Sequence, residues 1–213
     1  MGAFTVLPVA LRIEGRRCLV VGGGRVAEQK IAHLLEAGAD VTVVSPVICE
    51  ALARAHSTGR LTWRQGTFIP DDLAGVDLVF TATNDPLTNA QVAVLATRRH
   101  LFVNSADDPS NCTFFMTANV HRGPVTVSVS TGGSSPAVAS YLRRLIEREI
   151  GEEIAEVARL VAAARDEVIA RGESTEAISW SDVVNDELVE LVRRGDTVEA
   201  ANRLRAITER VAP

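Results

Sequence analysis

Near the start of the chain, a short apolar run leads directly into three consecutive glycines. The run covers residues 17–21, and the glycines are residues 22–24. After them, apolar residues recur at helical spacing until Gly38, which is typical of a helix C-terminus. A β-branched run at 40–45 follows, and Pro46 closes it. This order of strand, tight turn, helix and strand predicts a β-α-β unit.

The spacing Gly22-x-Gly24-x-x-Ala27 fits the fingerprint of a dinucleotide-binding loop. In that fingerprint the first glycine permits the tight turn, the second lets the backbone approach a pyrophosphate, and the third small residue lets the helix pack on the strand. The helix N-terminus then offers free N–H groups to the anion. A purely structural turn with the same spacing is the alternative, but a position between a strand and a helix favours dinucleotide binding.

The second strand lacks the acidic residue that usually binds the ribose hydroxyls of a dinucleotide about 20 residues after the glycines. The strand ends instead at Val44, Ser45 and Pro46, and no arginine stands there to bind a 2′-phosphate. We therefore expect backbone groups around Pro46 and Val47 to line the adenosine side. The residues alone leave the choice between NAD and NADP open.

Strands and helices are expected to alternate as far as residue 104. The expected strands are 61–66, 76–82 and 100–104, and the expected helices are 48–57 and 86–99. Strands separated by helices predict a parallel sheet that is covered by helices on both faces.

The pattern changes in the second half of the chain. Residues 124–130 alternate apolar and polar side chains, as a half-exposed strand does. Ser135 is expected to cap a helix whose first residue is Pro136. The remaining helices are expected at 136–150, 152–171, 181–194 and 197–210.

Composition and charge restrict the class of protein. The chain has 27 acidic and 22 basic side chains, and no basic stripe, which argues against a nucleic-acid partner. Because no basic-apolar leader opens the chain and no apolar run could cross a bilayer, we expect a cytoplasmic protein without a membrane partner. The scattered cysteines and histidines predict free thiols and no resident metal site.

Four segments occur in the order and spacing of one protein family. They are LPVALRIEGRRCLVVGGGRVAEQKIAHLLEAGADVTVVSP, LVFTATNDPLTNAQVAVLA, FVNSADDPSNCTF and VTVSVSTGGSSPAVASYLRR. Together they resemble the precorrin-2 dehydrogenase and sirohydrochlorin ferrochelatase family, which is the N-terminal region of siroheme synthases. The resemblance covers roughly residues 4–150 and depends on several motifs, not on the glycine loop alone.

The resemblance implies an α/β fold and an activity. A Rossmann-like doubly wound parallel sheet is expected at 1–113, a small α+β dimerisation region at 114–150 and a helical domain at 151–213. The implied activity is oxidation of precorrin-2 to sirohydrochlorin with NAD as hydride acceptor, in siroheme or cobalamin biosynthesis. Some family members also insert ferrous or cobaltous ion. The members are homodimers that bind the tetrapyrrole in a cleft between domains.

The length of the C-terminal region bears on the source of the substrate. The residues after Ile150 are too few for a typical methyltransferase domain. We therefore expect a separate uroporphyrinogen methyltransferase to supply precorrin-2.

The resemblance also implies functional residues. The expected NAD contacts are Gly22, Gly24, Arg25, Val26, Pro46, Val47, Thr83 and Asn84. The expected tetrapyrrole contacts are Asn104, Arg122 and Thr131, and no metal ligand is expected. Because the implied substrate carries many carboxylates, further cations are candidates for binding it: Arg98, Arg99, His100, His121, Arg143 and Arg144. A solvated helix end is the alternative for the four of these that are arginines.

Two adjacent aspartates follow the strand expected at 100–104. Asp107 matches the family's essential carboxylate and follows a parallel strand at the edge where such sheets bind ligands. Asp108 directly precedes Pro109 and is sufficiently explained as a turn former. Asp107 is therefore the expected catalytic residue. Three roles stay open for it: taking a proton, orienting the macrocycle, or helping to remove pyrrole protons during metal insertion.

Several positions depart from the family pattern. Ser105 and Ala106 replace a valine pair, Thr117 stands where proline is common, and His121 stands where aspartate is usual. These departures motivate an alternative function, a carrier or regulator that binds dinucleotide and tetrapyrrole without turnover. A third hypothesis is an NAD-dependent enzyme that acts on another small anion.

Overall fold

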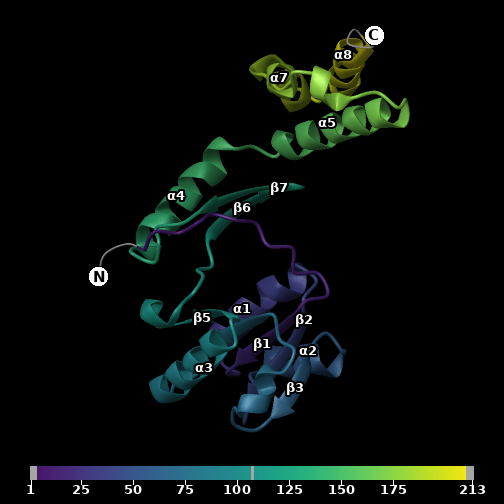
Figure 1. Ribbon diagram of the computed structural model, residues 1–213. Coiled ribbons are helices and arrows are strands. Elements are labelled where there is room, and N and C mark those ends of the chain that lie inside the picture. Colours follow the sequence, from purple (N-terminus) through teal and green to yellow (C-terminus); the bar gives the residue numbers. More distant parts are fainter. Residues whose placement is uncertain (1–3, 107, 210–213) are drawn as a thin grey trace. The chain divides into compact units, whose positions relative to one another are not determined.

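The computed structural model describes residues 4–106 and 108–209, which form two compact units (Figure 1). The first unit contains the chain up to residue 116 together with residues 132–134. The second contains residues 117–131 and the chain from residue 135 onward. The regions expected as a dimerisation region and a helical domain therefore lie mostly in one unit. Each unit is described by itself.

A five-stranded parallel sheet forms the centre of the first unit. Its strands are β1 (Arg17–Val21), β2 (Asp40–Ser45), β3 (Thr62–Gln65), β4 (Leu78–Thr81) and β5 (Phe102–Ser105). They lie in the order β3-β2-β1-β4-β5, and every neighbouring pair is parallel. The chain forms β1, β2 and β3 on one side of the sheet and then crosses to the other side of β1 to form β4 and β5, so the strand order reverses between β1 and β4. The doubly wound fold predicted from the alternation is confirmed.

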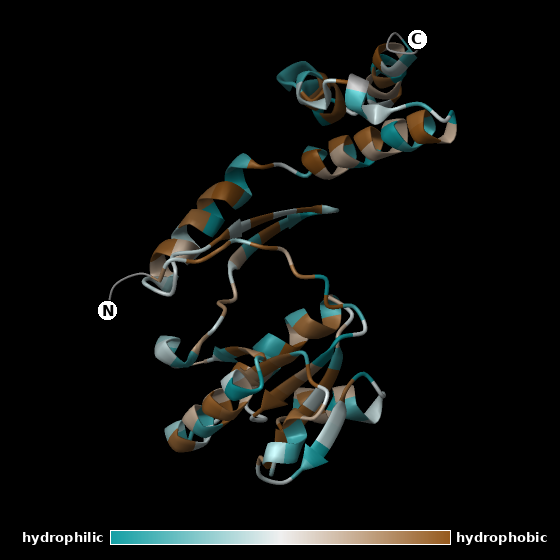
Figure 2. Cartoon of the chain, in the orientation of Figure 1, coloured by the Kyte–Doolittle hydropathy of each residue, from teal (hydrophilic) through white to brown (hydrophobic). Residues whose placement is uncertain are grey.

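Helices cover both faces of this sheet. They are α1 (Arg25–Glu36), α2 (Glu50–Ser57) and α3 (Pro86–Arg98), with short 3-10 turns η1 (Pro70–Leu73) and η2 (Pro109–Asn111). Alternate side chains of each central strand reach opposite faces, so Val20 packs with Ile31 of α1, and Leu19 packs with Val92 of α3. Figure 2 shows the central strands as mainly hydrophobic, which is expected of a parallel sheet buried on both sides.

The second unit begins with an antiparallel hairpin. The alternating residues predicted as a strand form β7 (Val125–Val129), which pairs with β6 (Ala118–Arg122). The chain turns at Gly123, whose φ is +53°. Helix α4 (Pro136–Glu149) follows, and the Ser135 side chain accepts a hydrogen bond from the Val138 N–H. The predicted cap at Ser135 is confirmed.

The rest of the second unit is helical. Its helices are α5 (Glu153–Ala170), η3 (Thr175–Ala177), α6 (Trp180–Val183), α7 (Asp186–Arg193) and α8 (Thr197–Glu209). The single helix predicted at 181–194 is two helices, because the Asn185 side chain accepts a bond from the Leu188 N–H and starts α7 anew. Leu188 and Leu204 are fully buried in the core of this helical part.

Candidate functional site

The glycine loop between β1 and α1 is shaped by two close backbone approaches. Gly22 has φ of +122°, and a β-carbon there would lie 2.3 Å from the Ala82 carbonyl oxygen. A β-carbon on Gly23 would lie 2.3 Å from the Val47 carbonyl oxygen. Both positions therefore exclude a side chain. The loop is tight because the ends of β2 and β4 press against it from either side.

Gly24 differs from its two neighbours, because a β-carbon on it would meet no atom within 4 Å. It is the N-cap residue of α1 and, because it has no side chain, it makes no side-chain capping hydrogen bond to the first turn of this helix. The first N–H groups of α1 therefore receive no side-chain cap from Gly24, and the positive end of the helix lies next to this open position. This arrangement fits an anion such as the pyrophosphate of a dinucleotide, and it leaves room for close backbone approach at Gly24.

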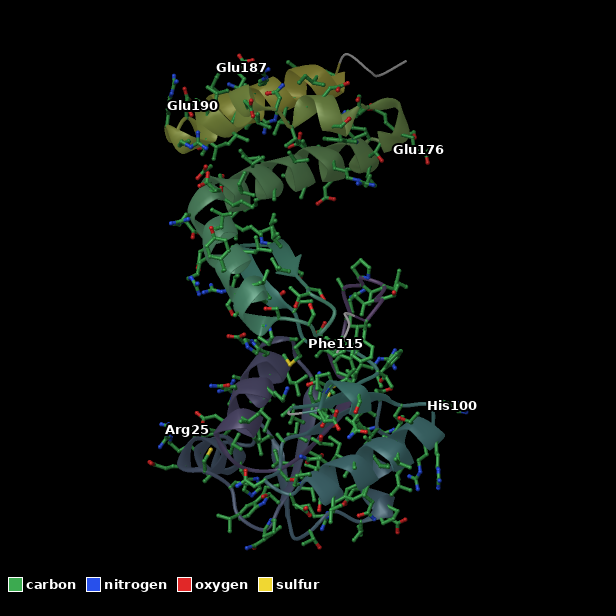
Figure 3. All side chains as sticks on the ribbon, turned by 90° about the vertical axis from the view of Figure 1, so that its left-hand side faces the viewer. Arg25, His100, Phe115, Glu176, Glu187 and Glu190 are labelled. Carbon is green, nitrogen blue, oxygen red and sulfur yellow. The ribbon has the colours of Figure 1, made fainter. Side chains whose placement is uncertain are left out.

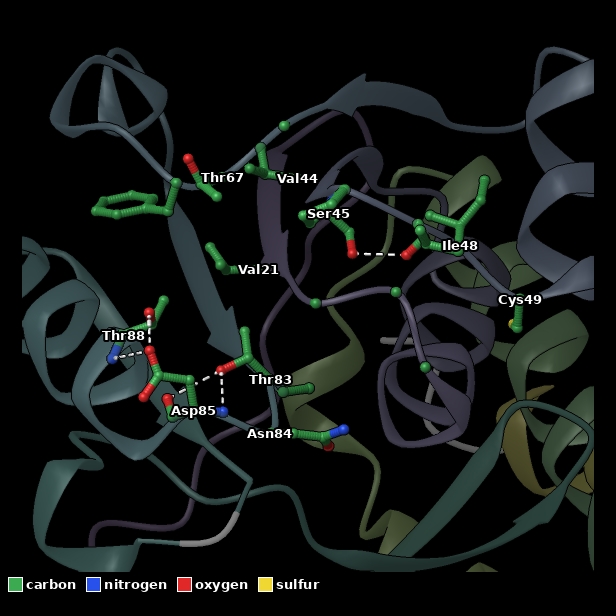
Figure 4. A pocket seen from close by; sticks show the side chains of 18 residues that line it. Val21, Val44, Ser45, Ile48, Cys49, Thr67, Thr83, Asn84, Asp85 and Thr88 are labelled. Atoms are coloured by element: carbon green, nitrogen blue, oxygen red, sulfur yellow. Dashed lines mark hydrogen bonds between the residues drawn. The ribbon is translucent and has the colours of Figure 1, made fainter.

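A pocket of about 570 Å³ opens in front of the glycine loop (Figure 4). Its walls include the three glycines, the segment after β2 with Pro46 and Val47, and the segment after β4 with Thr83 and Asn84. Six of the eight expected NAD contacts thus meet in one pocket. Arg25 and Val26 begin α1 beside it, and both are exposed. Figure 3 shows the Arg25 side chain projecting outward from the ribbon.

The wall after β2, which is expected to line the adenosine side, presents backbone and hydroxyl groups to the pocket. The Ser45 hydroxyl donates to the Val47 carbonyl at 2.6 Å, and the Gln65 amide donates to the Pro46 carbonyl at 3.3 Å. Trp63 also donates its indole N–H to the Ser45 carbonyl at 2.9 Å. These contacts hold the segment in place without a carboxylate. Among the residues that line this pocket in the described chain, Asp85 is charged and none is an arginine or lysine.

The opposite wall is the turn from β4 into α3. Asp85 caps α3 by accepting hydrogen bonds from the N–H groups of Leu87 and Thr88. The hydroxyl of Thr88 also donates to this carboxylate, and that bond is the main reason why the pKa of Asp85 lies below its ordinary value. The Thr83 hydroxyl oxygen accepts a hydrogen bond from the Asp85 N–H at 3.2 Å. Thr83 and Asn84 are therefore presented by a turn that is tied to the helix start.

Two buried polar residues, Asn104 and Ser105, end β5. Asn104 is 5% exposed, accepts a bond from the Lys30 ammonium at 2.7 Å and donates to the Phe114 carbonyl at 3.0 Å. Asn104, expected to contact substrate, therefore has its amide engaged within the protein. Ser105, one of the departures from the family pattern, is buried and accepts a bond from the Thr81 hydroxyl at 3.0 Å. A serine here is satisfied inside the sheet.

The two aspartates after β5 have different outcomes. Asp107 lies outside the described residues, so its expected catalytic role stays a prediction. Asp108 accepts bonds from the backbone N–H of Ser110 at 2.9 Å and from the Asn111 amide at 2.8 Å, and it begins η2. The hydrogen bond from the Ser110 hydroxyl is the main cause that lowers the pKa of Asp108. The interpretation of Asp108 as a turn former is confirmed.

Lys30, whose ammonium contacts the buried Asn104, was not singled out from the sequence. It lies on the face of α1 that packs on the sheet, between Ala27 and Leu34, and its ammonium is 5.9 Å from the centre of the Phe80 ring. The sequence does set this residue apart, because Lys30 is the single lysine among the 22 lysine and arginine residues of the chain.

Two expected substrate contacts lie in the second unit. Arg122 donates from Nε to the Ile150 carbonyl at 2.9 Å and from a terminal nitrogen to the Glu147 carbonyl at 2.8 Å. It therefore closes the C-terminal end of α4, and this favours a structural role for its guanidinium. Thr131 donates its hydroxyl to the Ser135 carbonyl at 3.2 Å. Their contact with substrate stays a prediction.

The other candidate cations lie at the end of α3, within α4 and in the hairpin. Arg98 and Arg99 end α3, and Arg143 pairs with Glu147 on α4 at 2.7 Å. The His121 ring is 3.0 Å from the Thr126 hydroxyl within the hairpin. Within residues 4–106 and 108–209, no group of three or more metal-ligating side chains comes together, and no helix is long and apolar enough to span a membrane.

Comparison with known proteins agrees with the motifs. A family model described as "Putative NAD(P)-binding" matches residues 9–118, and one described as "Sirohaem biosynthesis protein central" matches residues 122–149. A siroheme synthase of Nitrosococcus oceani is 38% identical over 95% of this chain and 44% of its own length. One of Nitrosospira multiformis is 41% identical over 76% of this chain and 35% of its own length.

A solved structure supports the fold. The protein titled "SirC, precorrin-2 dehydrogenase" matches with a TM-score of 0.77 and 24% identity, over 93% of this chain and all of its own. The chain spans less than half the length of the curated relatives named above. With the glycine loop, the pocket and both family models in agreement, the chain belongs to the NAD(P)-binding family that forms the N-terminal region of siroheme synthases.

Proposed function

We propose that this protein oxidises precorrin-2 to sirohydrochlorin with NAD as the hydride acceptor, in siroheme or cobalamin biosynthesis. The observation that carries the proposal is the glycine loop, whose open helix start faces a pocket of about 570 Å³. The relatives named siroheme synthase, and the neighbour titled precorrin-2 dehydrogenase, support this choice of substrate.

The pocket favours NAD over NADP. A 2′-phosphate on the adenosine ribose is normally bound by an arginine or another cation. The pocket-lining residues of the described chain include Asp85 but no arginine or lysine, and the segment after β2 presents Pro46 and Val47. We expect NADP to bind more weakly than NAD, because its additional charge would lack a partner. Titration of each nucleotide by calorimetry measures the difference.

The residues divide the work of the reaction between binding and proton transfer. Bound NAD supplies the hydride acceptor. Gly24 and the first turn of α1 bind the pyrophosphate, and Thr83 and Asn84 line the wall after β4. The substrate gives up a hydride and a proton, so a group near the reacting carbon must receive the proton. Asp107 is the residue proposed to act there, either on the proton or on the orientation of the macrocycle.

Wider features of the proposal come from the family resemblance. The protein acts in the cytoplasm as a homodimer, and its substrate comes from a separate uroporphyrinogen methyltransferase. The division into regions 1–113, 114–150 and 151–213, and a lyase activity that inserts ferrous or cobaltous ion into the product, belong to the same proposal. The metal is a substrate of that second step, so no resident metal site is required.

An assay with precorrin-2 tests the main step. With NAD present, we expect the spectrum of sirohydrochlorin to appear, and without NAD we expect no change. Adding ferrous or cobaltous ion to sirohydrochlorin in the same assay tests chelation separately. A wild-type protein that leaves precorrin-2 unchanged in the presence of NAD would refute the enzymatic proposal.

The Gly24→Ala variant tests the binding site without disturbing the fold. The φ of Gly24 is −88°, which any residue adopts, and an added methyl group meets no protein atom within 4 Å. We expect a melting temperature close to that of the wild type. Because the methyl group occupies the open space before α1, NAD binding should weaken strongly. Unchanged NAD affinity would remove the glycine loop from the site.

A binding protein without turnover is the second candidate function. It is favoured by the engaged amide of Asn104 and by the departures at Ala106, Thr117 and His121. The satisfied hydroxyl of Ser105 weakens it. Replacing Asp107 with Asn separates the two functions. Lost oxidation with retained NAD binding supports the enzyme, whereas cofactor and porphyrinoid binding without turnover in the wild type supports the carrier.

A further inference from the structure

Asn89 lies in the first turns of α3 and is buried, with 5% of its surface exposed. Its side chain forms three hydrogen bonds, and all of them are with Thr83. The Asn89 Oδ1 atom accepts from the Thr83 N–H at 3.3 Å and from the Thr83 hydroxyl at 2.8 Å. The Asn89 Nδ2 atom donates to the Thr83 carbonyl at 3.1 Å. One amide thus engages both backbone polar groups and the side chain of a single residue.

The residue held in this way forms part of the dinucleotide pocket. Thr83 is the second residue after β4 and lines the wall that faces the glycine loop (Figure 4). The preceding residue, Ala82, places its carbonyl oxygen against Gly22, where even a β-carbon would lie only 2.3 Å away. Because the backbone approach is this close, the position of the 82–84 segment sets the width of the pocket.

Helix capping does not require Asn89. The start of α3 is already capped by Asp85, which accepts bonds from the N–H groups of Leu87 and Thr88. The Asp85 N–H is in turn bonded to the Thr83 hydroxyl at 3.2 Å. The amide of Asn89 therefore serves the turn and not the helix end. A buried amide costs free energy unless its polar atoms are paired, so it persists where it specifies one geometry.

We propose that Asn89 is a positioning residue for dinucleotide binding, which fixes Thr83 and the adjoining pocket wall through its three hydrogen bonds with Thr83. The inference rests on the proposed NAD site and adds a residue that does not line the pocket. Asn89 acts through Thr83 and makes no contact with the nucleotide.

The first test compares two alanine variants by calorimetric titration with NAD. In Asn89→Ala the Thr83 backbone groups lose their partners, and we expect the Kd for NAD to rise about tenfold. Asn185→Ala is the matched control, because Asn185 caps α7 in the other unit with the same type of side chain. The control should lower the melting temperature and leave the Kd unchanged.

The second test uses Asn89→Asp, which keeps the shape of the side chain. The ionised carboxylate accepts both Thr83 donors, but it repels the Thr83 carbonyl, so NAD affinity should fall at neutral pH. Burial and the nearby Asp85 carboxylate raise the pKa of the introduced carboxyl group. As the pH falls and this group takes up a proton, it can again donate to the Thr83 carbonyl. NAD affinity of this variant should then recover towards that of the wild type.

The outcomes separate the two claims. Two results overturn the positioning role while the NAD site stands. The first is wild-type NAD affinity in Asn89→Ala. The second is weak NAD binding by Asn89→Asp at every pH together with a matching loss of NAD affinity in Asn185→Ala. A wild-type protein that binds no NAD refutes the proposed function and this inference together. A rise in KM for NAD with little change in kcat in Asn89→Ala supports the inference in the enzymatic assay.

Discussion

Helices α1 and α7 begin in opposite ways, although both start with a small polar or glycine residue. At α7 the Asn185 side chain accepts a hydrogen bond from the Leu188 N–H at 3.1 Å, so the helix start is satisfied within the protein. At α1 the N-cap is Gly24, which has no side chain to accept a hydrogen bond from the first turn. The difference indicates that the cap of α7 serves stability, whereas the backbone N–H groups at the start of α1 can bind a ligand.

The same difference runs through the two units. In the first, tight backbone contacts at Gly22 and Gly23 shape a pocket between strand ends. In the second, side-chain packing around Leu188 and Leu204, and ion pairs such as that between Arg193 and Glu153 at 2.7 Å, hold helices together. Figure 3 shows Glu187 and Glu190 on the outside of α7. Substitutions in each unit can therefore separate stability from nucleotide binding.

The largest effect is expected for Gly22→Ala. The substitution places a β-carbon 2.3 Å from the Ala82 carbonyl oxygen at a φ of +122°. Steric overlap and backbone strain together should cost more than about 3 kcal/mol of unfolding free energy. Urea denaturation measures this loss, and NAD binding should disappear with it. A variant with wild-type stability would contradict the close approach of the two strands.

Leu188→Ala should destabilise the second unit without affecting nucleotide binding. Leu188 is fully buried, so its truncation leaves a cavity in the helical core and should cost about 2–5 kcal/mol. Denaturation followed by circular dichroism measures this loss. The Kd for NAD, measured well below the transition, should equal that of the wild type. A weaker Kd would show that the two units are coupled.

A pH series tests the cap at the start of α3. The folded-state pKa of Asp85 lies below its ordinary value of 3.8, mainly because of the hydrogen bond from Thr88. Its contribution to stability is therefore full above the ordinary value and disappears as the pH falls through the lowered pKa. Melting temperatures of the wild type and of Asp85→Asn should differ at neutral pH and should converge only when the pH falls below the lowered pKa of Asp85. A constant difference would exclude this carboxylate as the source.

The smallest effect, a gain in stability, is expected for His100→Gly. His100 follows α3 with φ of +59°, a left-handed conformation that suits glycine, and Figure 3 labels it at this turn. The relief of strain exceeds the entropy cost of the added glycine, so stability should rise by about 0.5–1 kcal/mol. Thermal unfolding measures the gain, and NAD affinity should not change. A loss of stability would mean that the His100 ring is needed.

Much of the first unit was predictable because its signals are local. The glycine spacing, the alternation of strands and helices, and the Asp108–Pro109 turn each depend on residues close together in the chain. The helix start at Ser135 is of the same kind. The break at Asn185 was missed, although it is local, because the apolar pattern continues across it from 181 to 194.

The contacts of individual polar residues were less predictable. Asn104 was expected to contact substrate, which stays a prediction, and its amide oxygen accepts a hydrogen bond from Lys30, 74 positions away in the chain. Arg122 was expected to contact substrate, which stays a prediction, and its guanidinium closes α4 through the Ile150 carbonyl, 28 positions away. Asn89 was missed because the side chain of an asparagine within a helix is usually exposed to solvent. In each case the packing of other elements, and not the neighbouring residues, decides the partner.

The sequence by itself determined the doubly wound fold, the glycine loop and the family, because these depend on chain geometry over a few residues and on ordered motifs. Only the tertiary structure decided which polar groups are engaged inside the protein and which remain open to a ligand. The start of α1 has no side-chain cap from Gly24, whereas the amides of Asn89 and Asn104 are engaged. The physical reason is that a polar group must find a partner when it is buried, and burial is settled when strands and helices pack.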